Sequence, residues 1–167
     1  ESCNLGSINL SIMLKKVGDG YEIDYDKLRE TVKNAVHFLD NVIDVNKYPL
    51  VQIDEMTKST RKIGLGVMGW ADMLCKLEIP YDSEKALELA DTVMGFVQNT
   101  AMEKSEEIAK VKGAFPYYDK SSFANTGVQP RNATVTTIAP TGTLSIIAGV
   151  SSGIEPLFAI SYIRNVM

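Results

Sequence analysis

The chain has 167 residues, of which 45% are hydrophobic and 23% charged, proportions that exclude collagen-like and disordered proteins. Its 17 Lys and Arg against 21 Asp and Glu give a formal net charge of −4, so no basic excess is available for binding nucleic acid. No apolar run approaches the roughly 18 residues of a membrane span, and two cysteines are too few for a disulfide-stapled secreted scaffold. We therefore expect a protein of the reducing cytoplasm.

Both ends of the chain lie in sequence that is unusual for a domain boundary. The chain begins with Glu1 rather than methionine and ends at Met167, within or just after the apolar stretch 157–163. Because domains usually end in polar, exposed tails, we expect residues 1–167 to be a single segment of a longer polypeptide, incomplete at both ends.

The first half of the chain predicts a strand, a turn and a one-sided helix. The apolar residues at 5–12 favour a short strand, and the glycines around 17–20 a turn. A helix is expected to begin at Asp24 or Asp26, either of which could cap it, and to end at 46–49. Its apolar stripe comprises Leu28, Val32, Ala35, Val36, Leu39, Val42 and Ile43.

The second half alternates strand-like and helical sequence. Glycines among large side chains at 61–70 predict a tightly packed strand that passes into a helix at 71–76. The longest helix is expected from Ser83 to Lys112, closed by Gly113 in a left-handed conformation, followed by a loop at 115–130. The β-branched run 134–138 reads as a strand. Strands alternating with long helices predict an α/β fold with parallel pairing.

The strongest local signal for a binding site is the turn at 140–145. A strand leads into Pro140, Thr141, Gly142, Thr143 and Leu144, and a helix-compatible run follows. Amide groups at such a helix start, with the hydroxyls of Thr141, Thr143 and Ser145 beside them, can bind phosphate without a lysine. The alternative is a threonine-capped helix after a tight turn, and the residues alone leave both open.

Four other side chains are of types that can take part in catalysis or binding. Cys3 is either a small buried apolar residue or a redox thiol whose partner lies elsewhere, whereas Cys75, flanked by leucines, reads as core without a role. His37 has no second ligand at metal-binding spacing, so we expect a partly exposed structural histidine and no metal site. Glu155 could be a buried carboxylate with a polar partner or could cap a turn.

Three segments, in this order, resemble the large catalytic chain of ribonucleotide reductases. They are CNLGSINL at 3–10, RKIGLGVMGWAD at 61–72 and APTGTLSIIAGVSSGIEPLF at 139–158, and the similarity continues through KGAFP at 112–116. The sequences of these segments resemble most the class II, adenosylcobalamin-dependent enzymes. Class I chains are similar more loosely and typically carry other residues where Met68 and Gly142 stand.

The resemblance implies part of a ten-stranded α/β barrel, from its second half. In the family, the radical-bearing cysteine belongs to an Asn-x-Cys-x-Glu motif that lies just before the position matching Glu1 and is not in this sequence. Cys3 matches the second member of the redox pair, whose partner belongs to the first half of the barrel. Pro140, Thr141, Gly142, Thr143 and Leu144 match the loop that holds the substrate phosphates.

The resemblance also implies an activity and its partners. The family reduces ribonucleoside di- or triphosphates to 2′-deoxyribonucleotides by a thiyl-radical mechanism, in which the 2′ hydroxyl leaves as water and two thiols become a disulfide. The complete enzyme would use adenosylcobalamin, mostly bound outside this segment, and an external dithiol reductant such as thioredoxin, and would form a homodimer. The isolated segment should have no reductase activity, and its uncovered strand edges should favour association with the rest of the barrel.

Two other functions compete with this interpretation. A class I large subunit takes its radical from a metal-containing small subunit instead of cobalamin. A non-catalytic nucleotide-binding remnant would keep the phosphate loop and lose the chemistry. The residues that distinguish a class II from a class I enzyme lie outside this segment. An Asn-x-Cys-x-Glu motif immediately before Glu1 would distinguish either enzyme from the remnant.

Overall fold

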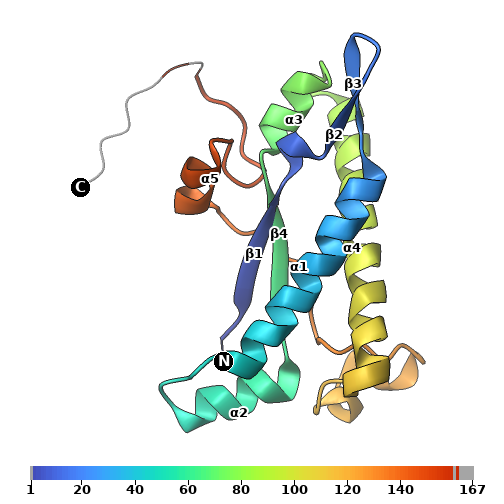
Figure 1. Ribbon diagram of the computed structural model, residues 1–167, viewed down its shortest axis with the longest axis vertical. Helices are drawn as coiled ribbons and strands as arrows, with labels where there is room; N and C mark the ends of the chain where they lie inside the picture. The colour runs from blue at the N-terminus through green and yellow to red at the C-terminus, as the bar shows by residue number, and fades with distance from the viewer. Residues whose placement is uncertain (1, 160, 162–167) are drawn as a thin grey trace.

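The structure is a computed structural model that describes residues 2–159 and 161, so the end of the apolar stretch 157–163 falls largely outside the described residues (Figure 1). Within them, four strands form two open two-stranded sheets. The strands are β1 (Asn4–Asn9), β2 (Leu14–Val17), β3 (Gly20–Ile23) and β4 (Ile63–Met68). The helices are α1 (Tyr25–Val45), α2 (Val51–Thr60), α3 (Trp70–Lys76), α4 (Glu84–Lys112) and α5 (Gly142–Ala148), and short 3-10 turns lie at Leu10–Ile12, Tyr118–Lys120 and Ser122–Asn125.

The central pair of strands is parallel. β1 and β4 pair in a register that places Asn4 opposite Ile63 and Asn9 opposite Met68. Parallel neighbours need a long connection, and here it contains the β2–β3 hairpin, α1 and α2. The expected α/β arrangement with parallel pairing is confirmed, whereas the antiparallel hairpin that surrounds the expected turn at 17–20 was not predicted.

The two long helices form as their sequences predict. Asp24, not Asp26, caps α1, since its Oδ1 accepts a hydrogen bond from the amide of Lys27 at 3.0 Å. Ser83 caps α4 by accepting from the amide of Ala86 at 3.2 Å. Gly113 follows α4 with a φ of 83°, as expected for glycine, but its ψ of 160° is extended rather than left-handed helical. In the described part of the chain, no helix has the length and apolar content that crossing a bilayer requires.

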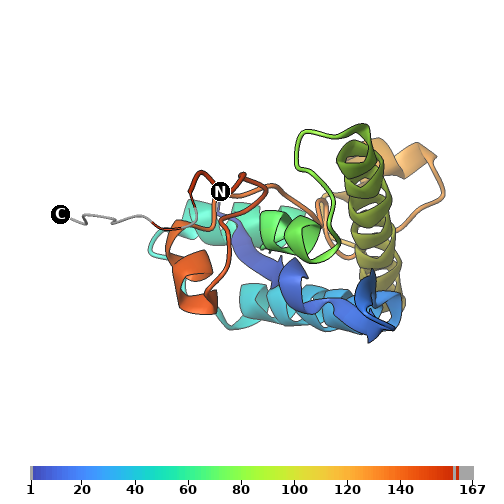
Figure 2. The ribbon, with the colours of Figure 1, turned by 90° about the horizontal axis from the view of Figure 1, so that it is seen from above.

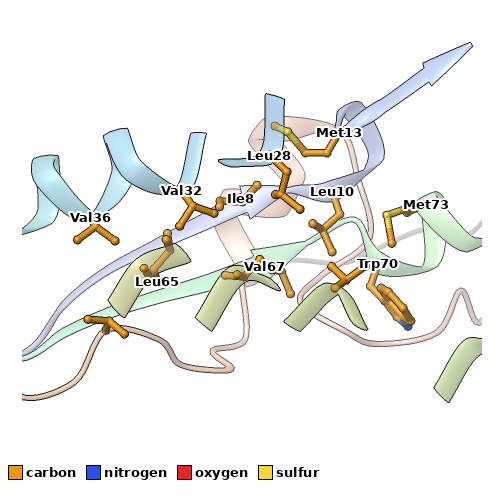
Figure 3. Packing of buried hydrophobic residues seen from close by; sticks show 14 of the residues in the cluster. Ile8, Leu10, Met13, Leu28, Val32, Val36, Leu65, Val67, Trp70 and Met73 are labelled. Atoms are coloured by element: carbon orange, nitrogen blue, oxygen red, sulfur yellow. The ribbon is translucent and has the colours of Figure 1, made fainter. Parts of the chain in front are cut away.

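The hydrophobic core lies where α1 and α4 cover one face of the parallel strands (Figure 3). Side chains from both strands, both helices and α3 meet there and are fully or almost fully buried. Burying a side chain of this size contributes about 1.5–3 kcal/mol. The largest are Leu10, Leu28, Ile43, Ile63, Leu65, Met73 and Leu74, with the valines at 32, 36, 67, 93 and 97.

Residues 134–137 lie along the edge of β4 that β1 does not occupy, where Leu65 and Thr136 form a parallel bridge, and the face of the strands away from the core is partly open. A Cβ placed on Gly64 would lie 2.7 Å from Leu5 Cδ2 and 2.9 Å from Thr137 Cγ2, and one on Gly66 would lie 3.1 Å from the carbonyl oxygen of Thr137. The two glycines therefore allow the backbone at Thr137 to approach β4. Leu5 remains 60% exposed on this face, and Figures 1 and 2 show α5 on the side of the strands away from α4.

Two expectations about secondary structure need correction, and one helix was missed. The first strand ends at Asn9, because residues 10–12 form a 3-10 turn whose cap is the side chain of Asn9. Residues 134–138 make one isolated parallel bridge, Leu65 with Thr136, instead of a strand, since the chain then turns away towards Pro140, which has no amide hydrogen to donate. Helix α2 was not predicted at all.

Gly66 provides a direct test of this close approach. We expect Gly66→Val to destabilise the complete chain by about 1–3 kcal/mol, because the added atoms meet a carbonyl oxygen that cannot rotate away. Gly95→Val is the matched control: Gly95 is exposed on α4 with nothing near its Cβ position, so the change should stay within about 0.5 kcal/mol. Thermal unfolding measures both, and equal effects would contradict the packing described here.

Candidate functional site

Cys3 lies in extended chain immediately before β1. Its side chain is exposed, and its sulfur lies 3.7 Å from the carbonyl oxygen of Asn4. The neighbouring Ser2 fastens this end of the strand to α2, because its amide donates to Thr57 Oγ1 at 3.3 Å. The structure thus excludes the expectation of a buried apolar cysteine for Cys3. It also corrects the expectation for Cys75, which is exposed on α3 because the buried face of that short helix carries Met73 and Leu74.

The segment that leads into the turn at 140–144 is held beside β4 by main-chain hydrogen bonds. Leu65 donates to the carbonyl of Val135 at 2.9 Å, and Thr137 donates back to Leu65 at 3.2 Å. Helix α5 begins when the amide of Ser145 donates to the carbonyl of Thr141 at 2.7 Å. The amides of residues 142–144 precede this bond, and within the described residues they have no hydrogen-bond acceptor. Such amides carry partial positive charge towards solvent.

A shallow pocket joins the beginning of β1 to this turn. It has a volume of about 160 Å³ and is lined by residues 5–7 of the strand and 139–144 of the turn. Cys3 is not among the lining residues but lies two positions before the first of them. Segments separated by more than 130 positions in the sequence therefore share one small depression on the open face of the sheet.

The three hydroxyls expected beside the amides are not equivalent. Thr143 is exposed, as expected for a ligand-binding group. Thr141 and Ser145 are buried instead: the Thr141 hydroxyl accepts from the amide of Gly153 at 2.8 Å, and the Ser145 hydroxyl lies 2.8 Å from that of Ser152. The Thr141 side chain does not cap α5, so the threonine-capped helix of the alternative interpretation is not formed.

His37 and Glu155 complete the predicted residues. His37 is exposed on α1, and no cluster of three potential metal ligands occurs among the residues that the structure describes. Glu155 combines parts of both expectations: its main-chain amide closes a turn onto Ser152, and its Oε2 is buried without a hydrogen-bond partner in the described part of the chain.

A buried ionic network at the beginning of β4 was not predicted from the sequence. Arg61 donates to Asp40 Oδ1 through Nε at 2.9 Å and through Nη2 at 2.8 Å, and to Asp44 Oδ1 at 2.7 Å. Asn132 donates to Asp40 Oδ1 and to the carbonyl of Arg61, both at 2.9 Å. A signal was present: Asp40 interrupts the apolar stripe of α1, and a buried carboxylate needs a cationic partner.

The network changes the pKa values of its members. Burial alone would lower the pKa of Arg61, but its hydrogen bonds to Asp44 and Asp40 outweigh burial and raise it. For the acid Asp44, burial acts in the opposite direction and would raise the pKa. The hydrogen bond and the charge of Arg61 outweigh burial, so the pKa of Asp44 is lowered overall. Burial and the charge of Arg61 lower the pKa of the nearby Arg131. These groups hold β4 in place and lie away from the pocket.

The fold and the pocket define part of an α/β domain whose candidate site lies on the open face of parallel strands. The family model for the barrel domain of ribonucleotide reductase matches residues 1–131 and 127–167. The chain belongs to this family.

Relatives of known name agree with the family model. The chain is 57% identical to the vitamin B12-dependent ribonucleoside-diphosphate reductase of Thermoplasma acidophilum and 52% identical to that of Mycobacterium tuberculosis, in both cases over its whole length. It spans 21% and 23% of these relatives, about a fifth of their length. It also superposes on the class Id ribonucleotide reductase alpha subunit of Actinobacillus ureae with a TM-score of 0.73 and 28% identity, covering 92% of this chain and 28% of that one.

Proposed function

We propose that this chain is part of the catalytic barrel of a B12-dependent ribonucleoside-diphosphate reductase. The observation that carries the proposal is the pocket shared by the beginning of β1 and the turn at 140–144, because it brings the strand that follows Cys3 next to amides that have no hydrogen-bond acceptor among the described residues. Identity supports the B12-dependent class: it is 57% to the relative from Thermoplasma acidophilum, against 35% to the reductase alpha subunit of Chlamydia trachomatis.

Cys3 is proposed as one of the two thiols that reduce the substrate. Side chains alternate along a strand, so extending β1 by one residue places Cys3 on the same open face as Leu5 and Ser7, which line the pocket. The reaction balances as follows: the ribose 2′ hydroxyl leaves as water, a hydrogen takes its place, and two thiols lose two electrons and two protons to become one disulfide. The second thiol would come from another part of the complete chain, and an external dithiol would reduce the disulfide again.

Pro140, Thr141, Gly142, Thr143 and Leu144 are proposed to hold the substrate phosphates. The amides of residues 142–144 and the exposed hydroxyl of Thr143 would supply the donors, since these residues line the pocket. Thr141 would contribute through its main chain, because its hydroxyl already accepts from Gly153. Holding the phosphates at this end would present the ribose at a fixed distance from Cys3.

Adenosylcobalamin supplies the radical in the proposed complete enzyme. Among the described residues, neither the apolar pocket between α3 and α4, with a volume of about 220 Å³, nor the pocket at the turn, with about 160 Å³, could enclose a corrin macrocycle. Most of its binding surface would belong to other parts of the complete chain.

The remaining partners follow from the open architecture. β1 has one neighbouring strand in the described residues, so its other edge would pair with the rest of a ten-stranded barrel, of which residues 1–167 are a single segment from the second half. A dithiol protein such as thioredoxin would be the reductant, and the complete cytoplasmic enzyme would be a homodimer.

A charge placed in the loop tests the proposal. In the complete chain, we expect Thr143→Asp to raise the KM for a ribonucleoside diphosphate roughly 10- to 100-fold, because a carboxylate about 5 Å from a phosphate costs on the order of 1–3 kcal/mol. The same carboxylate in the first turn of α5 stabilises the helix, so loss of folding would not explain the result. Thr143→Asn is the matched uncharged control, with a much smaller rise expected. Equal KM values for the two variants would contradict phosphate binding at this loop.

A further inference from the structure

The segment 150–153, here called the strap, is hydrogen-bonded to the proposed phosphate loop. The amide of Val150 donates to the carbonyl of Ser145 at 3.0 Å, and the hydroxyls of Ser152 and Ser145 lie 2.8 Å apart. The amide of Gly153 donates to the hydroxyl of Thr141 at 2.8 Å. The strap therefore contacts the loop at both ends of its first helical turn.

The strap is in turn anchored to the beginning of α3. The amide of Gly69, at the junction between β4 and α3, donates to the carbonyl of Ser151 at 2.8 Å. The amide of Ser151 donates to Asp72 Oδ2 at 2.7 Å, a short, charge-assisted hydrogen bond. Gly69 has a φ of 70°, and a Cβ there would lie 2.9 Å from Asn9 Oδ1, so the junction is also fixed against the end of β1.

These contacts form a continuous path from the strand of Cys3 to the loop. β1 pairs with β4, β4 passes through Gly69 into α3, Asp72 holds Ser151, and the strap holds Thr141 and Ser145. Among the residues that the structure describes, Asp72 contributes the carboxyl side chain that bonds the strap. It does not line the pocket, so it would act on a ligand only through the position of the loop.

We infer that Asp72 is a positioning residue that sets where the phosphate loop stands relative to the strand of Cys3. The inference rests on the proposed function and adds to it a residue outside the loop that governs substrate affinity. Without the carboxylate, the amide of Ser151 loses its acceptor and the strap can move away from α3. Displacements of about 1 Å at a binding group are enough to cost large factors in rate or affinity.

Variants of Asp72 in the complete chain test the inference. We expect Asp72→Ala to raise the KM for a ribonucleoside diphosphate about 10-fold, the scale of one hydrogen bond to a charged group, with kcat changed less than about 3-fold. Asp72→Asn keeps an oxygen that can accept from Ser151 and should return KM to within about 3-fold of the unaltered enzyme. Asp91→Ala, an exposed aspartate on α4, is the control and should leave both constants unchanged.

The changes in kcat and KM of the Asp72 variants distinguish a positioning role from a merely structural one. If Asp72 only stabilised the fold, Asp72→Ala would reduce the active fraction and lower kcat at unchanged KM, which would overturn the inference. An Asp72→Asn enzyme with the KM of Asp72→Ala would also overturn it. If Thr143→Asp raises KM and Asp72→Ala does not, the inference fails and the phosphate loop stands; if neither raises KM, the loop proposal fails as well.

Discussion

Replacing Cys3 by serine should abolish repeated reduction of ribonucleotides by the complete chain. A serine hydroxyl has nearly the same size, but it cannot form the disulfide that delivers two electrons to the substrate. We expect multiple-turnover activity with an external dithiol to fall by at least about 10³-fold, the scale seen when a reacting side chain is removed. Because Cys3 does not line the pocket at the loop, the affinity for a ribonucleoside diphosphate should change little.

Cys75 provides the matched control for this change. It is the second exposed cysteine of the chain and lies on α3, and Cys75→Ser should keep full activity. A single turnover without external reductant, followed by peptide mapping, should find Cys3 in a disulfide with a cysteine from another part of the complete chain. A Cys3→Ser enzyme with more than a tenth of the original activity would contradict the assigned role.

The two long helices were predictable because their signals are local. The apolar positions of α1 recur along one face, and Asp24 and Ser83 stand where a cap is needed. Helix α2 has neither signal: Leu50 at its start offers no capping side chain, and Thr57 is its one fully buried residue. It ends at Thr60, and the following Arg61 is a non-glycine residue with a φ of 47° whose guanidinium is held by Asp40 and Asp44 from another helix. Asp40 in the apolar stripe of α1 indicates that a cationic partner is needed, but no local pattern identifies Arg61 as that partner.

The candidate site was predictable as segments but not as side-chain geometry. The turn at 140–144 carries local helix-start chemistry, and resemblance to a family pointed to Cys3. The pocket between them depends on Gly64 and Gly66 allowing close packing, which requires the three-dimensional register. The inward orientation of Thr141 and Ser145 depends on the strap, more than five positions further along the chain. The hydrogen bond between Asp72 and Ser151 joins residues 79 positions apart, and no periodic pattern in the sequence predicts such a contact.

Removing either partner of the Arg61–Asp40 pair should have the largest effect on stability. Arg61 is 4% exposed and Asp40 is fully buried, so Asp40→Ala leaves a buried guanidinium whose remaining carboxylate partner is the partly exposed Asp44, and Arg61→Ala leaves a carboxylate in the protein interior. Breaking such a buried pair costs about 3–5 kcal/mol. Hydrogen exchange of the amides of Ile63 and Leu65, in the adjoining strand, should then accelerate about 10²- to 10⁴-fold in the complete chain.

A second pair of charges serves as the control for burial. Lys58 and Asp54 form an ion pair of 2.7 Å on the surface of α2, and Asp54→Ala should cost about 0.5 kcal/mol or less. Arg61→Lys should not rescue the network, because one ammonium cannot reach the acceptors on Asp40 and Asp44 that Nε, Nη1 and Nη2 serve together. Exchange rates at β4 that respond equally to Asp54→Ala and Asp40→Ala would contradict the importance of burial.

The same network predicts the direction of a pH effect. The pKa of Asp44 is lower in the folded protein than its ordinary value of 3.8, because Arg61 outweighs the effect of burial. The stabilisation from Asp44 is therefore complete well above pH 3.8, where the carboxyl is ionised in both states, and is lost as the pH falls through the lower, folded value. In Asp44→Asn this acid-induced loss at β4 should shrink, since the amide does not titrate. Exchange at Ile63 between pH 5 and pH 3 measures the difference, and an unchanged pH profile would show that other carboxyls govern acid unfolding.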